Sequence, residues 1–205
     1  MKRKSLWQSA DCADWDAALQ TYADVIAAQN VNGLAEVDAW YRTELPQRIA
    51  SRTPAHITRE ELERVAVWKM KRGVWRERNR LLVIGNDPKL VEQTSAEALA
   101  AAPDPRKPIA LLSELAGVGP ATASAVLAAY APEVYPFFDE LVAAQIPRLG
   151  AVSFTLPYYL RYAAQLRERA DELKAGCEHH TWTVQDVSQA LWAASGGKAG
   201  GSGHR

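Results

Sequence analysis

Apolar residues recur every three to four positions along most of the chain, with polar residues between them, which is the spacing of an amphipathic helix. No segment alternates apolar and polar residues for long enough to indicate a strand. The stripes predict helices within residues 14–29, 34–49, 59–72, 74–84, 88–102, 156–173 and 183–191. Together with the segments described below, they indicate an all-α fold of about ten helices.

Capping residues mark several helix boundaries. Thr58-Arg-Glu-Glu61 is a capping box, in which a threonine and a glutamate satisfy amides at a helix start. Asp87-Pro88 suits another start, and Gly73 suits a stop. Because the connections are short, we expect a single helical domain over residues 1–195, in which two lobes are possible. Residues 196–205 are rich in glycine and serine and are predicted to be disordered.

The charge and the cysteines limit the kind of protein. The 205 residues carry a formal net charge of zero, so contact with DNA would need a local patch of cations. No run of about 18 apolar residues occurs that could cross a membrane. The two cysteines, Cys12 and Cys177, are too few for a disulfide framework or for a four-cysteine iron–sulfur cluster. We expect a soluble, intracellular protein that does not associate with membranes, and a monomer.

Residues 108–131 contain two helical segments around a tight Gly117-Val118-Gly119 turn. Glycine tolerates the backbone geometry of such a turn, and Pro120 suits the first position of the following helix, where a missing N–H costs nothing. The turn amides and the first amides of this helix would then point outward and favour a phosphate oxygen. The same pattern also fits an ordinary connection between two helices.

The run Leu115-Ala-Gly-Val-Gly-Pro-Ala-Thr122-Ala123 resembles the hairpin of the helix-hairpin-helix, Gly/Pro-Asp superfamily of DNA glycosylases. In that superfamily a catalytic aspartate follows after a second, proline-bearing loop. Asp139 lies 20 positions after Gly119 (139 − 119), which is similar to the spacing in the endonuclease III branch. The resemblance covers about residues 108–142, and it implies an all-α fold in which DNA lies across a cleft between two helical parts.

The resemblance also implies contacts and an activity. Gly117, Val118, Gly119, Ala121 and Thr122 would hold one phosphate of double-stranded DNA, a contact that fixes register without reading sequence. Ala121 stands where superfamily members that also nick the strand have a lysine, and alanine cannot form a Schiff base. The implied enzyme is therefore a monofunctional DNA glycosylase without lyase activity.

Asp139 immediately precedes Glu140-Leu-Val and suits a helix N-cap. The aspartate of the superfamily also lies at a helix start, so the resemblance implies both roles. Breaking the bond between a base and deoxyribose leaves an oxocarbenium-like sugar. A fixed carboxylate stabilises this positive charge and can orient or deprotonate the attacking water. We interpret Glu140 as helix first-turn charge rather than a second catalyst.

Residues 68–80 carry six cations and one anion in an otherwise neutral chain. The candidate phosphate contacts among them are Lys69, Lys71, Arg72, Arg76 and Arg78. The run Trp68-Lys69-Met-Lys-Arg72-Gly73 also resembles a segment shared by a little-characterised group of helix-hairpin-helix proteins. The alternative is an ordinary solvated helix surface whose tryptophans lie in the core.

A pocket for a flipped base would need aromatic or apolar walls. The available aromatic residues, most of which we expect in the core, are Trp7, Trp40, Tyr135, Tyr158 and Tyr159. Cys177, His179 and His180 could bind a metal, yet no distant pair of ligands completes a set of four. We therefore assign no metal and no cofactor.

The leading hypothesis is a DNA glycosylase of base excision repair. It would flip a nucleotide of double-stranded DNA and use Asp139 to hydrolyse the N-glycosidic bond of a damaged or modified base. Two alternatives stay open. One is a non-catalytic DNA-binding module that recognises damaged or bent duplex by shape, and the other is a helical protein-interaction domain whose hairpin is architectural.

Overall fold

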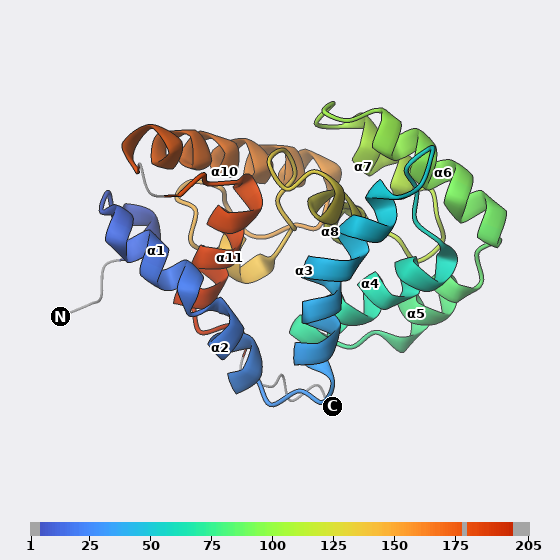
Figure 1. Ribbon diagram of the computed structural model, residues 1–205, viewed down its shortest axis with the longest axis horizontal. Helices are drawn as coiled ribbons and strands as arrows, with labels where there is room; N and C mark the ends of the chain where they lie inside the picture. The colour runs from blue at the N-terminus through green and yellow to red at the C-terminus, as the bar shows by residue number, and fades with distance from the viewer. Residues whose placement is uncertain (1–4, 178–179, 199–205) are drawn as a thin grey trace.

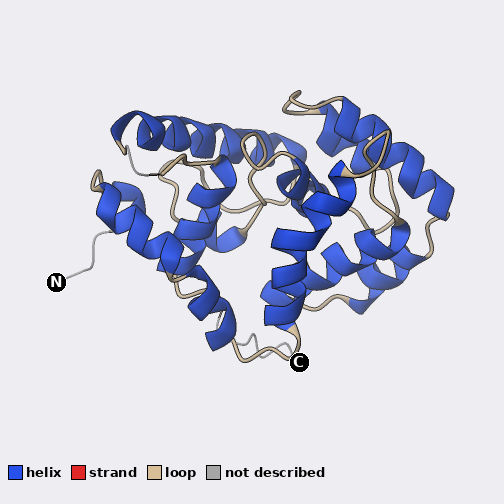
Figure 2. Cartoon of the chain, in the orientation of Figure 1, coloured by secondary structure: helices blue, strands red, loops and turns tan. Residues whose placement is uncertain are grey.

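The computed structural model describes residues 5–177 and 180–198, and within these ranges it contains eleven α-helices, one short 3-10 helix and no strand (Figure 1). Figure 2 shows the helices joined by loops and turns throughout the described ranges. The predicted all-α class is therefore confirmed. The elements are η1 (Leu6–Gln8), α1 (Cys12–Gln20), α2 (Tyr22–Ala28), α3 (Leu34–Ala50), α4 (Arg59–Arg72), α5 (Glu77–Ile84), α6 (Pro88–Ala100), α7 (Lys107–Leu112), α8 (Pro120–Tyr130), α9 (Glu140–Ala143), α10 (Leu156–Gly176) and α11 (Val184–Ala194).

The capping residues start helices where the sequence predicts them. Thr58 and Glu61 form a capping box at the start of α4, and the side chain of Asp87 caps α6. The stripe over residues 14–29 differs from the prediction, because it forms two helices that meet at Thr21. The Thr21 hydroxyl donates to the carbonyl of a residue three positions earlier, a local bond that competes with helix continuation.

The helices pack as two groups that share a core. The N-terminal helices α1 and α2 lie against α11 at the other end of the chain, and α11 packs against α10, whereas α3 to α8 pack on one another (Figure 1). Buried apolar side chains from both groups belong to one hydrophobic cluster. Segments from the two ends of the sequence therefore contribute to the same structural unit.

Helix α8 is buried on all sides. Its residues 121–129 are all buried, and it packs against α3, α4 and α7. Most of these residues are alanine, which lets the neighbouring backbones approach closely, and the Tyr41 hydroxyl of α3 donates to the carbonyl of Ala125 at 2.7 Å. A helix that is apolar all round belongs to a core. The hairpin turn before α8 is therefore carried by a rigid element.

A disulfide joins Cys12 at the start of α1 to Cys177, the residue after α10. The cysteines are 165 residues apart, so their pairing depends on the tertiary packing of α1 and α10 and not on any local spacing. The sequence analysis predicted no framework of several disulfides, and it did not predict this single bond. Cys177 is consequently not available as a thiolate ligand for a metal while the bond is intact.

Part of the predicted disordered tail has a defined place. The carbonyl of Gly196 accepts a hydrogen bond from Gln29 Nε2 at 3.0 Å, and Lys198 forms an ion pair with Glu140. Residues 199–205 lie outside the described part of the chain, so for them disorder stays a prediction. None of the described helices is long and apolar enough to cross a membrane.

Candidate active site

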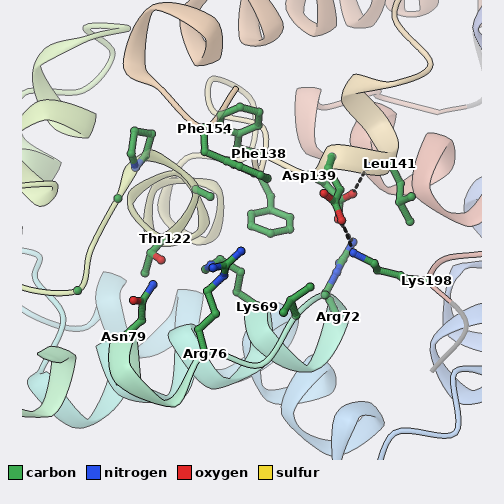
Figure 3. A pocket seen from close by; sticks show the side chains of 18 residues that line it. Lys69, Arg72, Arg76, Asn79, Thr122, Phe138, Asp139, Leu141, Phe154 and Lys198 are labelled. Carbon is green, nitrogen blue, oxygen red and sulfur yellow. Dashed lines mark hydrogen bonds and ion pairs between the residues drawn. The ribbon is translucent and has the colours of Figure 1, made fainter. Parts of the chain in front are cut away.

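A pocket of about 370 Å³ is lined mainly by three separate segments of the chain, with Phe154 and Lys198 contributed by two others. One wall comes from the end of α4 and the loop to α5, a second from the hairpin turn and the start of α8, and a third from residues 137–141. The predicted site residues that line it are Lys69, Arg72, Arg76, Gly117, Gly119, Ala121, Thr122 and Asp139. Figure 3 shows Lys69 and Arg76 on one side of this pocket, facing Thr122 and Phe138 on the other. The structure thus brings the basic segment, the hairpin and the aspartate together.

Asp139 caps α9 and also borders the pocket. Its Oδ1 accepts a hydrogen bond from the Leu141 N–H at 2.8 Å, and its Oδ2 lies 3.2 Å from Nη2 of Arg72 (Figure 3). The residue is only 8% exposed. The N-cap predicted from its position is therefore present, and the same carboxylate is held in one orientation at the pocket wall.

Side chains from three helices hold the backbone that leads into this aspartate. The Phe138 N–H donates to Ser124 Oγ of α8 at 2.9 Å, and the Phe137 N–H donates to Gln185 Oε1 of α11 at 2.9 Å. The Tyr162 hydroxyl of α10 donates to the Phe137 carbonyl at 2.7 Å. These buried bonds fix the loop between α8 and α9, because breaking any of them would leave a polar group unpaired in the core.

Arg72 is the centre of a buried hydrogen-bond network. Its Nη1 donates to the Tyr22 hydroxyl at 2.6 Å, and that hydroxyl donates to Asp38 Oδ1 at 2.8 Å. Asp38 also accepts from Trp68 Nε1 at 2.8 Å and from Arg42 Nε at 3.0 Å. The network links α2, α3 and α4 to the pocket aspartate, so it positions the carboxylate from behind.

The sequence predicts Arg72 as a phosphate contact at the surface, but the structure shows that its side chain is buried. Its side chain is only 3% exposed, and its guanidinium lies 4.3 Å from the ring of Trp192 and 4.9 Å from that of Trp68. Burial alone would lower the pKa of Arg72, but the Tyr22 hydroxyl and the Asp139 and Asp38 carboxylates raise it above its ordinary value. Arg72 is therefore a permanently charged partner of the aspartate rather than a surface cation.

Lys69 and Arg76 are the two basic residues of this segment, apart from Arg72, that line the pocket. Arg76 is exposed, whereas Lys69 is partly buried. Burial, together with the nearby charge of Arg76, lowers the pKa of the Lys69 amine.

The other predicted cations lie away from the pocket. The Lys71 ammonium contacts the carbonyl of Asn32, in the loop before α3. Arg78 is exposed and does not line the pocket. Arg80 is engaged by Glu63 and Glu77 at 2.7 and 2.6 Å. The basic segment therefore divides between a part that faces the pocket and a part that covers other surfaces.

The hairpin turn matches its predicted backbone in part. Gly117 has a φ of +76°, which favours glycine, and its Cα packs against α5. Val118 differs from the prediction that its amide is free, because its N–H donates to the Leu115 carbonyl at 3.1 Å and its side chain is buried. Within the described part of the chain, the amides of Gly119 and Ala121 have no backbone acceptor. These two amides remain the candidates for an anion contact.

The aromatic wall of the pocket differs from the one considered in the sequence. Phe137, Phe138 and Phe154 line it, and Phe154 is 50% exposed with its ring centroid 5.0 Å from that of Phe138. The aromatic residues proposed from the sequence, Trp7, Trp40, Tyr135, Tyr158 and Tyr159, are all buried in the core. The position of Phe137 and Phe138 directly before Asp139 is the one sequence signal that could have identified them. Phe154 lies in an irregular loop and has no such signal.

Glu140 and Lys198 also line the pocket, and they form an ion pair with each other. The pair supports the interpretation of Glu140 as a helix first-turn charge, since its carboxylate already has a partner. Lys198 belongs to the segment after α11 that the sequence predicts to be disordered, so its place at the pocket was not foreseen. His179, one of the considered metal ligands, lies outside the described residues.

Comparisons of the chain with protein-family models, with curated proteins and with solved structures found no match.

Proposed function

We propose that this protein is a helix-hairpin-helix DNA glycosylase that binds double-stranded DNA and hydrolyses the N-glycosidic bond of a damaged or modified base. The observation that carries the proposal is the single pocket that joins Asp139, the hairpin turn and the cations of the segment between α4 and α5. These parts come from separate segments of the chain, and each of them would serve a different step of such a reaction.

The pocket suits a flipped nucleotide. Its volume of about 370 Å³ lies in the range of ligand pockets, and the half-exposed ring of Phe154 offers a face on which a base can stack. The amides of Gly119 and Ala121 and the guanidinium of Arg76 would contact phosphates at the pocket mouth. Because the chain has no net charge, these local contacts would supply the electrostatic part of DNA binding.

Asp139 would act on the sugar. As the bond between C1′ and the base nitrogen breaks, positive charge develops on deoxyribose, and a carboxylate beside it stabilises that charge. Water adds to C1′, and the base leaves with a proton. The Leu141 amide and Arg72 hold the carboxylate in place before the substrate arrives, so no reorientation is needed during the reaction.

A salt titration of duplex binding tests the DNA contact. Each neutralised phosphate contributes about 0.9 to the slope of log affinity against log salt, so Arg76→Ala should reduce the slope by about that amount. Lys71→Ala is the matched control, because Lys71 is a cation of the same segment that faces Asn32 instead of the pocket. Equal slopes for wild type and Arg76→Ala would contradict the contact. Absence of salt-dependent binding would favour a protein-interaction domain.

A second candidate function is a non-catalytic module that recognises damaged or bent duplex. The observation in its favour is that both carboxylate oxygens of Asp139 already have partners within the protein, as a purely structural cap and ion pair would. Asp139→Asn separates the two functions. It should abolish base release by a glycosylase and leave duplex binding unchanged in a binding module.

A further inference from the structure

We propose that Lys69 is a nucleophile that forms a Schiff base with the open-chain aldehyde of an abasic deoxyribose, which gives the pocket a strand-cleaving activity. This inference rests on the proposed function, because removal of a base produces the abasic sugar in the same pocket. It departs from the expectation of an enzyme without lyase activity, which considered the residue at position 121 alone.

The position of Lys69 supports this role. It lies on α4 and lines the same pocket as Asp139, although the two residues come from different walls (Figure 3). At the start of α8, Ala121 lines the pocket with only a methyl group. An amine from α4 can therefore share the pocket with a sugar that lies beside the aspartate.

The amine of Lys69 has no acidic partner. Within the described ranges, no carboxylate lies within 4.0 Å of its Nζ, in contrast to Lys198 at the same pocket, which pairs with Glu140. The positive charge of Arg76 also acts on Lys69. An ammonium group that is partly buried and next to another cation loses its proton more readily, and the neutral amine is the nucleophilic form.

Other basic groups of the pocket cannot replace it. Arg72 and Arg76 stay protonated, so they do not add to carbonyl groups. The amine of Lys198 is already engaged in an ion pair with the Glu140 carboxylate. Lys69 is the remaining amine among the described lining residues.

The reaction balances without an oxidant or a reductant. The neutral Lys69 amine adds to C1′ of the aldehyde, and loss of water gives a protonated imine. A base, for which Asp139 is the candidate carboxylate, takes a proton from C2′. The C3′–O bond then breaks, and the departing strand carries a 5′-phosphate. Water hydrolyses the imine, which releases an unsaturated aldehyde on the other strand end and restores Lys69.

Trapping with cyanoborohydride tests the inference directly. The full chain is incubated with a duplex that contains a preformed abasic site and with sodium cyanoborohydride, which reduces the imine to a stable covalent bond. We expect a protein–DNA adduct on a denaturing gel, and mass spectrometry of its peptides should place the DNA remnant on Lys69. Lys69→Ala should lose the adduct, whereas Lys71→Ala, the cation two positions along the same helix, should keep it.

The outcomes separate this inference from the proposed function. Duplex binding and base release without any adduct, or an adduct that maps to another amine, would overturn the role of Lys69 and leave the glycosylase standing. Lys69→Arg provides a second variant that keeps the positive charge, and it should bind duplex DNA yet form no adduct. Absence of both DNA binding and adduct would overturn both proposals.

Discussion

Asp139 and Arg72 are buried together, so neither charge can be removed alone without leaving the other uncompensated. The cap and the ion pair use different oxygens of the carboxylate, and a substitution can therefore separate them. Asparagine is as good an N-cap as aspartate, but it brings no charge.

We expect Asp139→Asn to lower the free energy of unfolding by about 3 kcal/mol, because Arg72 then remains charged in a buried site without its carboxylate. Urea denaturation measures this loss. The double variant Asp139→Asn, Arg72→Met removes both charges and should recover part of the stability. A single variant that is as stable as the wild type would show that the ion pair is not a buried, coupled unit.

The position of Asp139 near the hairpin was predictable from the sequence, whereas the burial of Arg72 was not. The resemblance to the glycosylase superfamily, in which an aspartate follows the hairpin at a similar spacing, led to the prediction of Asp139 as a site residue, and Gly119 and Asp139 lie in one short stretch of chain. The burial of Arg72 could not be predicted, since it depends on Tyr22, Asp38 and Trp192, which come from distant helices. In the sequence, Arg72 is one cation among several at the end of an amphipathic helix.

The hairpin turn packs directly against helix α5. A Cβ atom on Gly117 would lie 2.6 Å from the carbonyl oxygen of Asn79 and 2.9 Å from Cβ of Leu82, and the φ of Gly117 is +76°. Gly119 differs, because its φ is −104° and a Cβ atom there would meet nothing within 4 Å. Of these two glycines, only Gly117 is therefore required by the backbone conformation and packing of the turn.

Gly117→Ala should destabilise the protein by about 2 kcal/mol or more, from backbone strain and from the clash with α5. Gly119→Ala should change the stability by less than about 1 kcal/mol, since the added methyl group enters open space. Thermal or urea unfolding of the two variants measures the difference. Equal losses for both would contradict the close packing of the turn against α5.

Helix positions were predictable because their causes are local. Thr58 and Glu61 satisfy each other's amides within one turn of chain, and an apolar stripe requires no knowledge of the partner helix. The division between α1 and α2 at Thr21 was missed, since the stripe runs through it without interruption. The contribution of Phe154 to the pocket was also missed. Phe154 lies in an irregular loop, where no periodic pattern indicates which side chains face a pocket.

The Cys12–Cys177 disulfide closes most of the chain into one loop. A crosslink of this kind mainly restricts the unfolded state, and removal of a native disulfide costs about 2 to 5 kcal/mol. We therefore expect reduction by dithiothreitol, or the Cys12→Ser, Cys177→Ser double variant, to lower the free energy of unfolding by that amount. Unchanged stability after complete reduction would show that the disulfide does not stabilise the folded protein.

The disulfide also bears on where the protein works. An intracellular location stays a prediction, and disulfides are rare in a reducing cytosol but persist in oxidising environments. The pairing of two cysteines 165 residues apart could not be predicted, because it requires the packing of α1 beside the end of α10. The sequence alone does not indicate that Cys12 and Cys177 lie close together in the folded protein.

The proposed glycosylase requires a pocket around Asp139 that is complementary to a positively charged deoxyribose in duplex DNA. This complementarity is tested by comparing the affinity of wild type and Asp139→Asn for two duplexes, one undamaged and one with a cationic aza-sugar in place of a nucleotide. The aza-sugar imitates the charge of the transition state, so no choice of base is needed. Binding to the undamaged duplex serves as the control that the variant is folded. We predict that wild type prefers the aza-sugar duplex and that Asp139→Asn loses this preference while it keeps its affinity for undamaged DNA. Equal affinity of both proteins for both duplexes would contradict the proposed complementarity and leave Asp139 as a helix cap.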